Sequence, residues 1–156
     1  MRLGAVLAMA AALCYALLIH LMLRDGGALF GDQAALDLRV AGYTAEEARR
    51  WLEGLTEAQR ATYFGALAMV DTLFPVLLGA ALAVFLWQLG GKWVIALPVA
   101  YAVSDLLENS TIRSLPEVAN FAQTATWAST LTLWKFASLL VAALALGWRI
   151  WQRRQR

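Results

Sequence analysis

The segment Ser104–Ser110, with the sequence SDLLENS, places two carboxylic acids and an amide at the end of an apolar run. Asp105, Glu108 and Asn109 have an i, i+3, i+4 spacing, so on a helix they share one face, with Tyr101 one turn before them. Such acids transfer protons, bind cations or pair with a base. An ionised side chain exposed to lipid at mid-membrane costs at least about 2.5–3.5 kcal/mol. We therefore expect these side chains to face other helices.

The composition and the length of the apolar runs indicate an integral membrane protein. The chain has 156 residues, of which 61% are hydrophobic and 15% are charged, and its mean hydropathy is +0.60. A soluble domain averages about 25% charged residues. Four apolar runs are each near the roughly 20 residues that cross a bilayer as a helix. Barrel strands are shorter and alternate in polarity. We predict an all-α fold, a single domain over residues 1–156 that forms a bundle of four transmembrane helices at about residues 3–23, 63–87, 93–112 and 121–148.

The segment between the first two spans predicts a short amphipathic surface helix over about residues 45–55. Thr44 and Glu47 have the spacing of a capping box at its start. Its apolar side consists of Trp51, Leu52 and Leu55. We expect this helix to lie on the membrane surface. A second capping pair, Thr56 and Gln59, starts the next helix, which is expected to run unbroken into the second span.

Four spans place both termini on the same side of the membrane. Basic residues near the span ends are divided evenly between the two sides, and the four arginines in the basic C-terminal tail at 149–156 decide the orientation. We predict a multi-pass protein of the bacterial inner (plasma) membrane with cytoplasmic termini, so the segment 24–60 lies outside. A cleaved signal peptide is the alternative for the first run. The expected partners are the lipid bilayer and either further copies of the chain or other membrane proteins, with no nucleic acid.

Several ionisable side chains are predicted to lie at one depth in the membrane. Counting 1.5 Å per residue from the tryptophans and the chain start at the inner ends of the spans places them about 18–26 Å above that side. The hydrocarbon core is about 30 Å thick. They are His20, Asp71, Asp105, Glu108 and Lys135. Together with Asn109 and Tyr101 they form the candidate binding site, in which three acids face one lysine.

Pro75 lies four residues after Asp71 and cannot donate a backbone hydrogen bond to its carbonyl. A free carbonyl beside a carboxylate is a candidate site for a cation or a proton. The alternative is that Pro75 only bends the helix, as prolines in membrane helices do. The serines and threonines of the fourth span are expected to be mainly packing residues.

Several site types are excluded by residue counts. Cys14 is the only cysteine, which excludes an internal disulfide, a CxxC pair and a thiolate zinc site. A single histidine provides no paired haem ligands, and no phosphate loop, dinucleotide fingerprint or HExxH motif is present. A hard-metal site of carboxylates and Asn109 would need Lys135 to be turned away. We therefore expect no cofactor and no metal.

The order GYTAEEA, LTEAQRATYFGALAMVDTLFP and SDLLEN, followed by a late lysine in the fourth span, resembles a group of small bacterial four-helix membrane proteins that are uncharacterised. The resemblance covers about residues 42–136. It implies the same four-span architecture and supplies no activity.

Three functions are compatible with these residues. The first, which these residues favour, is a structural or assembly bundle, in which the buried polar layer fixes the register of the helices. The second is binding or transport of protons or small cationic solutes, since intramembrane acids often mark such pathways. The third is an intramembrane enzyme on a lipid-soluble substrate, with Asp105 or Glu108 as general acid or base and Lys135 stabilising an anion. The absence of an activated nucleophile or a known catalytic motif argues against the enzyme.

Overall fold

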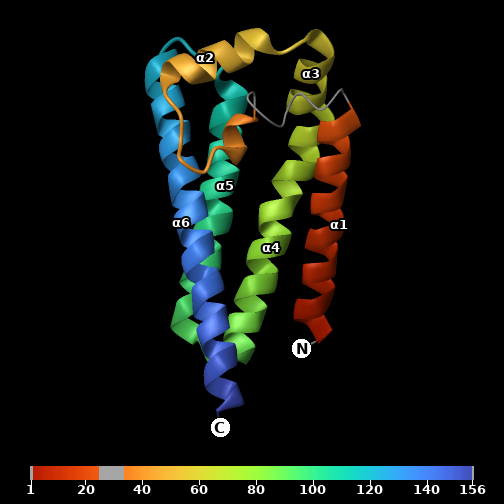
Figure 1. Cartoon of the computed structure of the whole chain (residues 1–156), viewed down its shortest axis with the longest axis vertical. Coiled ribbons are helices and arrows are strands. Elements are labelled where there is room, and N and C mark those ends of the chain that lie inside the picture. The colour runs from red at the N-terminus through yellow and green to blue at the C-terminus, as the bar shows by residue number, and fades with distance from the viewer. Residues whose placement is uncertain (1, 25–33, 156) are drawn as a thin grey trace.

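The apolar runs of the chain fold into long helices that lie side by side (Figure 1). The computed structural model describes residues 2–24 and 34–155, and no strand occurs in these residues. The all-α prediction is therefore confirmed for this part of the chain. The long helices are α1 (Arg2–Arg24), α4 (Ala68–Gln88), α5 (Ala96–Ser114) and α6 (Phe121–Arg154). The short elements are η1 (Leu36–Leu38), α2 (Ala45–Gly54), α3 (Glu57–Thr62), the π-helical η2 (Tyr63–Leu67) and η3 (Lys92–Ile95).

Three helices are long and apolar enough to cross a membrane. They are α1, the continuous helix Glu57–Gln88 and α6. The second of these joins α3, η2 and α4, as expected from the capping pair at its start. α5 is not among the three, because its 19 residues include Asp105, Glu108 and Arg113. Length and composition thus support three of the four predicted spans.

The long helices pack mainly as a row in chain order. α1 packs against α4, α4 against α5, and α5 against α6, and a smaller contact joins α4 to α6. No extensive contact joins α1 to α6 among the described residues. The described ends of the chain lie at the same end of the bundle (Figure 1). The row therefore has a flank, between α1 and α6, that direct helix packing does not close.

The short helix α2 lies across the opposite end of the bundle (Figure 1). Its predicted capping box is present: the Glu47 N–H donates to the Thr44 hydroxyl, and the Thr44 N–H donates to the Glu47 carboxylate at 2.6 Å. These hydrogen bonds lower the pKa of Glu47. Trp51, Leu52 and Leu55 are buried in the protein's own core. The ends of the long helices cover this side of α2, and the position of α2 at the membrane surface stays a prediction.

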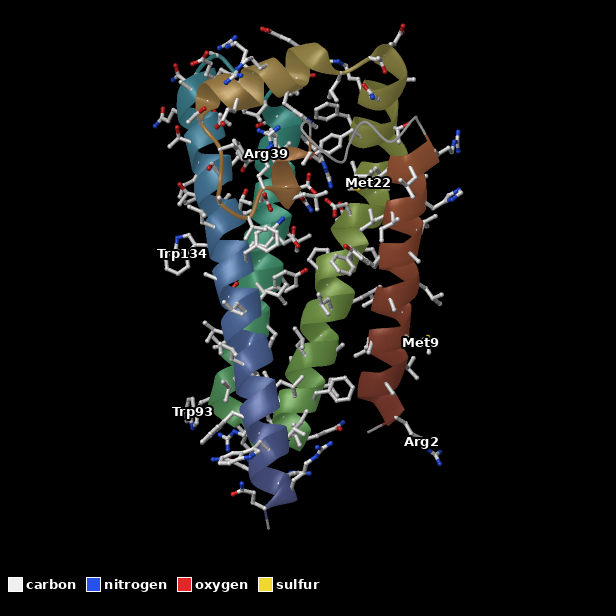
Figure 2. All side chains as sticks on the ribbon, in the orientation of Figure 1. Arg2, Met9, Met22, Arg39, Trp93 and Trp134 are labelled. Atoms are coloured by element: carbon white, nitrogen blue, oxygen red, sulfur yellow. The ribbon has the colours of Figure 1, made fainter. Side chains whose placement is uncertain are left out.

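Apolar side chains cover the outside of the bundle. Met9, Trp93 and Trp134 point away from the other helices (Figure 2). Four exposed tryptophans, at positions 87, 93, 148 and 151, lie towards the end where α4 and α6 finish. Arg153 joins these two helices there, since its guanidinium donates to the Gln88 carbonyl at 2.5 Å. The outer surface thus has the apolar character expected of helices in contact with lipid.

Gly79 permits the close approach of α4 to α5. A Cβ atom at this position would lie 3.0 Å from the Pro98 carbonyl oxygen and 3.0 Å from the Ala102 Cβ. We expect Gly79→Ala to lower the free energy of unfolding by about 1–3 kcal/mol, because the helices must separate to admit the methyl group. The measurement is thermal or denaturant unfolding of the purified protein.

Gly147→Ala is the matched control for this substitution. Gly147 also lies within a helix, but a Cβ there would have no neighbour within 4 Å. Alanine is the better helix former by about 0.5–1 kcal/mol. The control should therefore leave stability unchanged or raise it. Equal effects of the two substitutions would contradict the close approach at Gly79.

Candidate functional site

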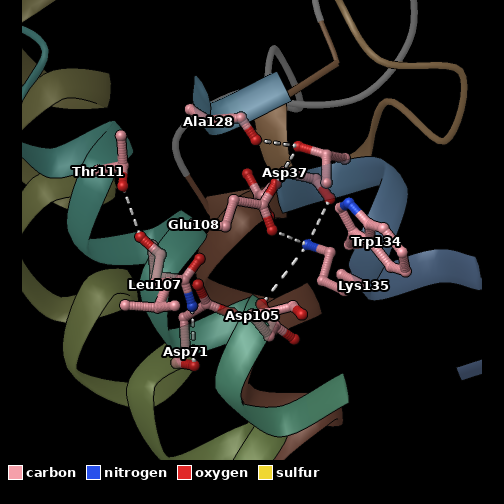
Figure 3. Close-up of polar contacts among 12 residues, drawn as sticks. Asp37, Asp71, Asp105, Leu107, Glu108, Thr111, Ala128, Trp134 and Lys135 are labelled. Atoms are coloured by element: carbon pink, nitrogen blue, oxygen red, sulfur yellow. Dashed lines mark hydrogen bonds and ion pairs between the residues drawn. The ribbon is translucent and has the colours of Figure 1, made fainter. Parts of the chain in front are cut away.

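Lys135 of α6 lies at the centre of a buried ionic cluster (Figure 3). Its ammonium nitrogen is 2.5 Å from Glu108 Oε2 and 3.5 Å from Asp105 Oδ1. Both acids lie on α5, and their three-residue spacing directs them to the same side of that helix. The structure thus joins three of the predicted site residues. A hard-metal site would need Lys135 to be turned away, whereas its ammonium lies between the two carboxylates.

Glu108 has a second contact on α6. The hydroxyl of Thr132 donates to Glu108 Oε1. Thr132 lies one turn before Lys135, so both residues face α5. The Glu108 side chain is fully buried, and one carboxylate oxygen contacts the lysine while the other accepts from the threonine. A buried charge requires close partners of this kind.

A third contact to Lys135 comes from the segment that precedes α2. The lysine ammonium donates to the backbone carbonyl of Asp37 in η1 at 2.9 Å. The Asp37 carboxylate, in turn, accepts from the Tyr63 hydroxyl at 2.7 Å. Asp37 is 5% exposed. η1 is therefore inserted among the long helices, and the side of the membrane on which the segment 24–60 lies stays a prediction.

The chain that follows η1 is also held against α6. The Tyr43 N–H donates to the Ser129 hydroxyl at 2.8 Å. Burial, and next the Glu108 carboxylate, raise the pKa of the Tyr43 phenol, so it stays protonated at neutral pH. Gly42, with φ +77°, makes the preceding turn, and a Cβ there would lie 2.8 Å from the Ser129 hydroxyl oxygen. The segment is thus fitted closely to the helix surface.

Asp71 of α4 contributes a carbonyl and a carboxylate with different surroundings. Its carbonyl, left without a backbone donor by Pro75, accepts from the side-chain amide of Asn109 at 3.3 Å. The predicted free carbonyl is therefore occupied by the predicted amide. The Asp71 carboxylate receives no hydrogen bond and forms no ion pair in the described part of the chain. We refer to Asp37, Asp71, Asp105, Glu108 and Lys135 as the carboxylate–lysine cluster.

A cavity of about 290 Å³ lies beside this cluster. Its charged lining residues are Asp37, Asp71, Asp105 and Lys135. The rest of its wall is apolar or aromatic and comes from all four long helices and η1, with Leu18, Met22, Phe74, Leu78 and Leu139 among its members. Small-molecule sites typically measure about 300–1,000 Å³ and combine an apolar wall with a few polar groups. This cavity has that composition and lies at the lower limit of that range.

Two further predicted residues have different positions. Tyr101 is buried and lines the cavity beside Asp105. His20 is exposed on α1 and does not line the cavity. Leu18 and Met22 are the buried residues on either side of it, and a residue two positions from each points away from them. His20 was therefore predicted on the wrong face of α1, and its depth in a membrane stays a prediction.

Sequence reasoning missed Asp37 and Thr132. The sequence could have identified Thr132, because it is one turn from Lys135 on the same helix face. Asp37 had a weaker signal, as a single acid within the apolar stretch AALDL. Its position depends on the path of a connecting segment, which helical periodicity does not predict.

No family model, curated protein or solved structure matches this chain. The resemblance to small bacterial four-helix membrane proteins stays a prediction. Among residues 2–24 and 34–155, no group of three or more histidine, cysteine, aspartate or glutamate residues is arranged to hold a metal ion.

Lys135→Met should lower the free energy of unfolding by about 3–5 kcal/mol, because it leaves Glu108 and Asp105 buried without their cation. Adding Glu108→Gln should recover part of this loss, since one uncompensated carboxylate is removed. The measurement is a double-mutant cycle on the unfolding transition. Additive losses in the double variant would contradict direct pairing of Lys135 with Glu108.

Proposed function

We propose that the chain is a four-span integral membrane protein whose cavity binds a cationic group. Support for the fourth span comes from the surroundings of α5, which packs between α4 and α6 and turns Asp105, Glu108 and Asn109 inward. Polar side chains are tolerated at membrane depth where they face protein and find partners. Because its polar side chains face protein, α5 can cross the membrane beside the three more apolar helices.

We propose the bacterial inner membrane as the location, with both termini on the cytoplasmic side. Arg2, Lys92, Arg149, Arg153 and Arg154 all lie towards the end of the bundle that carries the termini. Basic residues at span ends favour the cytoplasmic side. The exposed tryptophans at the same end fit an interfacial belt.

Single cysteines test this orientation. In a Cys14→Ala background, Glu53→Cys on α2 should react with a membrane-impermeant maleimide added to intact spheroplasts, since α2 lies at the outer end. Gln155→Cys, at the other end, should react only after permeabilisation. Both positions are exposed in the protein, so access depends on the membrane. The reverse pattern, or equal labelling, would contradict the proposed topology.

The observation that carries the cation site is the Asp71 carboxylate, which lines the cavity and has no hydrogen bond or ion pair in the described part of the chain. The cluster holds four carboxylates and one lysine. The neighbouring Arg113 does not correct this excess by direct pairing, because its guanidinium donates to the Ala68 carbonyl at 2.6 Å and the Thr72 hydroxyl at 2.7 Å. A cation beside Asp71 would restore the balance of charge.

The structural role is a second candidate, and one observation favours it. Lys135 binds the Asp37 carbonyl, so the cluster fixes η1 to α5 and α6 as well as joining those helices. This role accounts for Glu108, Thr132 and Lys135. It gives no reason for an acid at Asp71, whose carboxylate adds no bond between helices. The two roles are therefore separable at Asp71.

Methylammonium chloride tests the cation site. We expect it to raise the melting temperature of the purified protein above that in sodium chloride at equal ionic strength, because a ligand that binds the folded state stabilises it. Asp71→Asn should remove most of this rise. Glu117→Gln, which changes an exposed carboxylate, is the matched control and should retain it. No rise in the unmodified protein, or an equal rise in Asp71→Asn, would contradict the site.

A further inference from the structure

We infer that the cation is the head group of a lipid-soluble amine with one hydrocarbon chain, which enters the cavity from the bilayer between α1 and α6. This inference rests on the cation site proposed above and adds the class of ligand and its route. It depends on the shape and lining of the cavity as well as on its charge.

The lining of the cavity is amphiphilic. It contains the carboxylates of Asp71 and Asp105 and the aromatic side chains of Tyr15, Phe74 and Tyr101. The rings of Tyr15 and Phe74 lie against each other at a centroid distance of 5.4 Å and a tilt of 33°. Aromatic faces attract ammonium groups, which adds to the attraction of the carboxylates. The other lining side chains are mainly aliphatic, so a ligand that fills the cavity needs a cationic head and an apolar body.

The route follows from the packing of the helices. α1 and α6 both line the cavity, yet no extensive contact joins them among the described residues. Tyr15 lines the cavity and is also 48% exposed. The cavity wall therefore reaches the outer surface of the bundle at α1. In a four-span arrangement this surface faces lipid, so the ligand arrives from the hydrocarbon phase with its chain partly in the bilayer.

Charge and volume select against the other common amphiphiles. A fatty acid would place its carboxylate beside Asp71 and Asp105, where like charges repel. Lys135 does not compensate for this, because Glu108, Asp105 and the Asp37 carbonyl already surround its ammonium. A fatty alcohol fits the wall but lacks the charge. A cavity of about 290 Å³ also excludes a phospholipid with two chains, which exceeds the usual range of drug-sized sites.

Photolabelling in phosphatidylcholine nanodiscs tests the ligand class. Three probes carry the same diazirine-bearing dodecyl chain and differ only in the head group, which is a primary amine, an alcohol or a carboxylate. We expect the amine to label cavity residues such as Leu18, Leu78 and Leu139, located by mass spectrometry of peptides. Labelling by the alcohol and by the carboxylate should be lower than labelling by the amine by a factor of at least about ten, as expected for a lost charge-assisted contact.

Leu139→Trp tests the apolar part of the cavity. The larger side chain should fill the space and reduce amine labelling of α1 and α4 about tenfold, while methylammonium still raises the melting temperature. Leu140→Trp is the matched control, because Leu140 is 60% exposed on the outside of the same helix, and it should label as the unmodified protein does. Ile19→Trp fills the cavity from α1 and replaces Leu139→Trp if that variant does not fold.

The outcomes separate this inference from the function on which it rests. If methylammonium gives no stabilisation, the cation site itself fails. If methylammonium stabilises but the three probes label the cavity equally, the amine head group is wrong. If labelling is confined to lipid-facing positions such as Met69, or Leu139→Trp and Leu140→Trp behave alike, the lateral route into the cavity is overturned while the cation site stands.

Discussion

A buried lysine ammonium must be surrounded by acceptors, and this requirement organises the half of the bundle that lies nearer to α2. Removing an ammonium from water costs several kcal/mol, which only close anions and hydrogen-bond acceptors repay. Lys135 obtains them from Glu108, Asp105 and the Asp37 carbonyl. These acceptors come from two separate segments of the chain. The burial of one cation therefore ties α6 to α5 and to η1 at the same point.

The residues that contact Lys135 need hydrogen-bond donors of their own, and these donors extend the network. Glu108 takes a hydrogen bond from Thr132, and Asp37 takes one from Tyr63 at the start of the long helix that contains α4. The side-chain amide of Asn109 donates to the Asp71 carbonyl, which Pro75 leaves without a backbone donor. Each contact satisfies a group that would otherwise be buried without a partner. Three of the four long helices and η1 are thereby fixed in register near one level.

The network does not include the Asp71 carboxylate, and α1 takes no part in it. α1 contributes small and apolar side chains to its contact with α4, among them Gly4, Ala11, Cys14 and Leu18. Such packing holds a helix in place without fixing it to the ionic cluster. The cavity lies where the two kinds of packing meet, with carboxylates from the network on one side and the apolar face of α1 on the other. This boundary gives the cavity both its charge and its apolar wall.

The sequence by itself determined the helices, the capping boxes of α2 and α3, and the shared face of Asp105, Glu108 and Asn109, because these depend on local spacing. It also predicted that Asp71 and Lys135 lie at the depth of that face, because helical rise converts residue counts into distance. Rotation about a helix axis, however, is decided by packing, so His20 was placed on the wrong face. The insertion of η1 beside Lys135 and the protein-covered face of α2 were likewise decided by tertiary structure. Both follow from contacts between segments far apart in the chain, which no local pattern records.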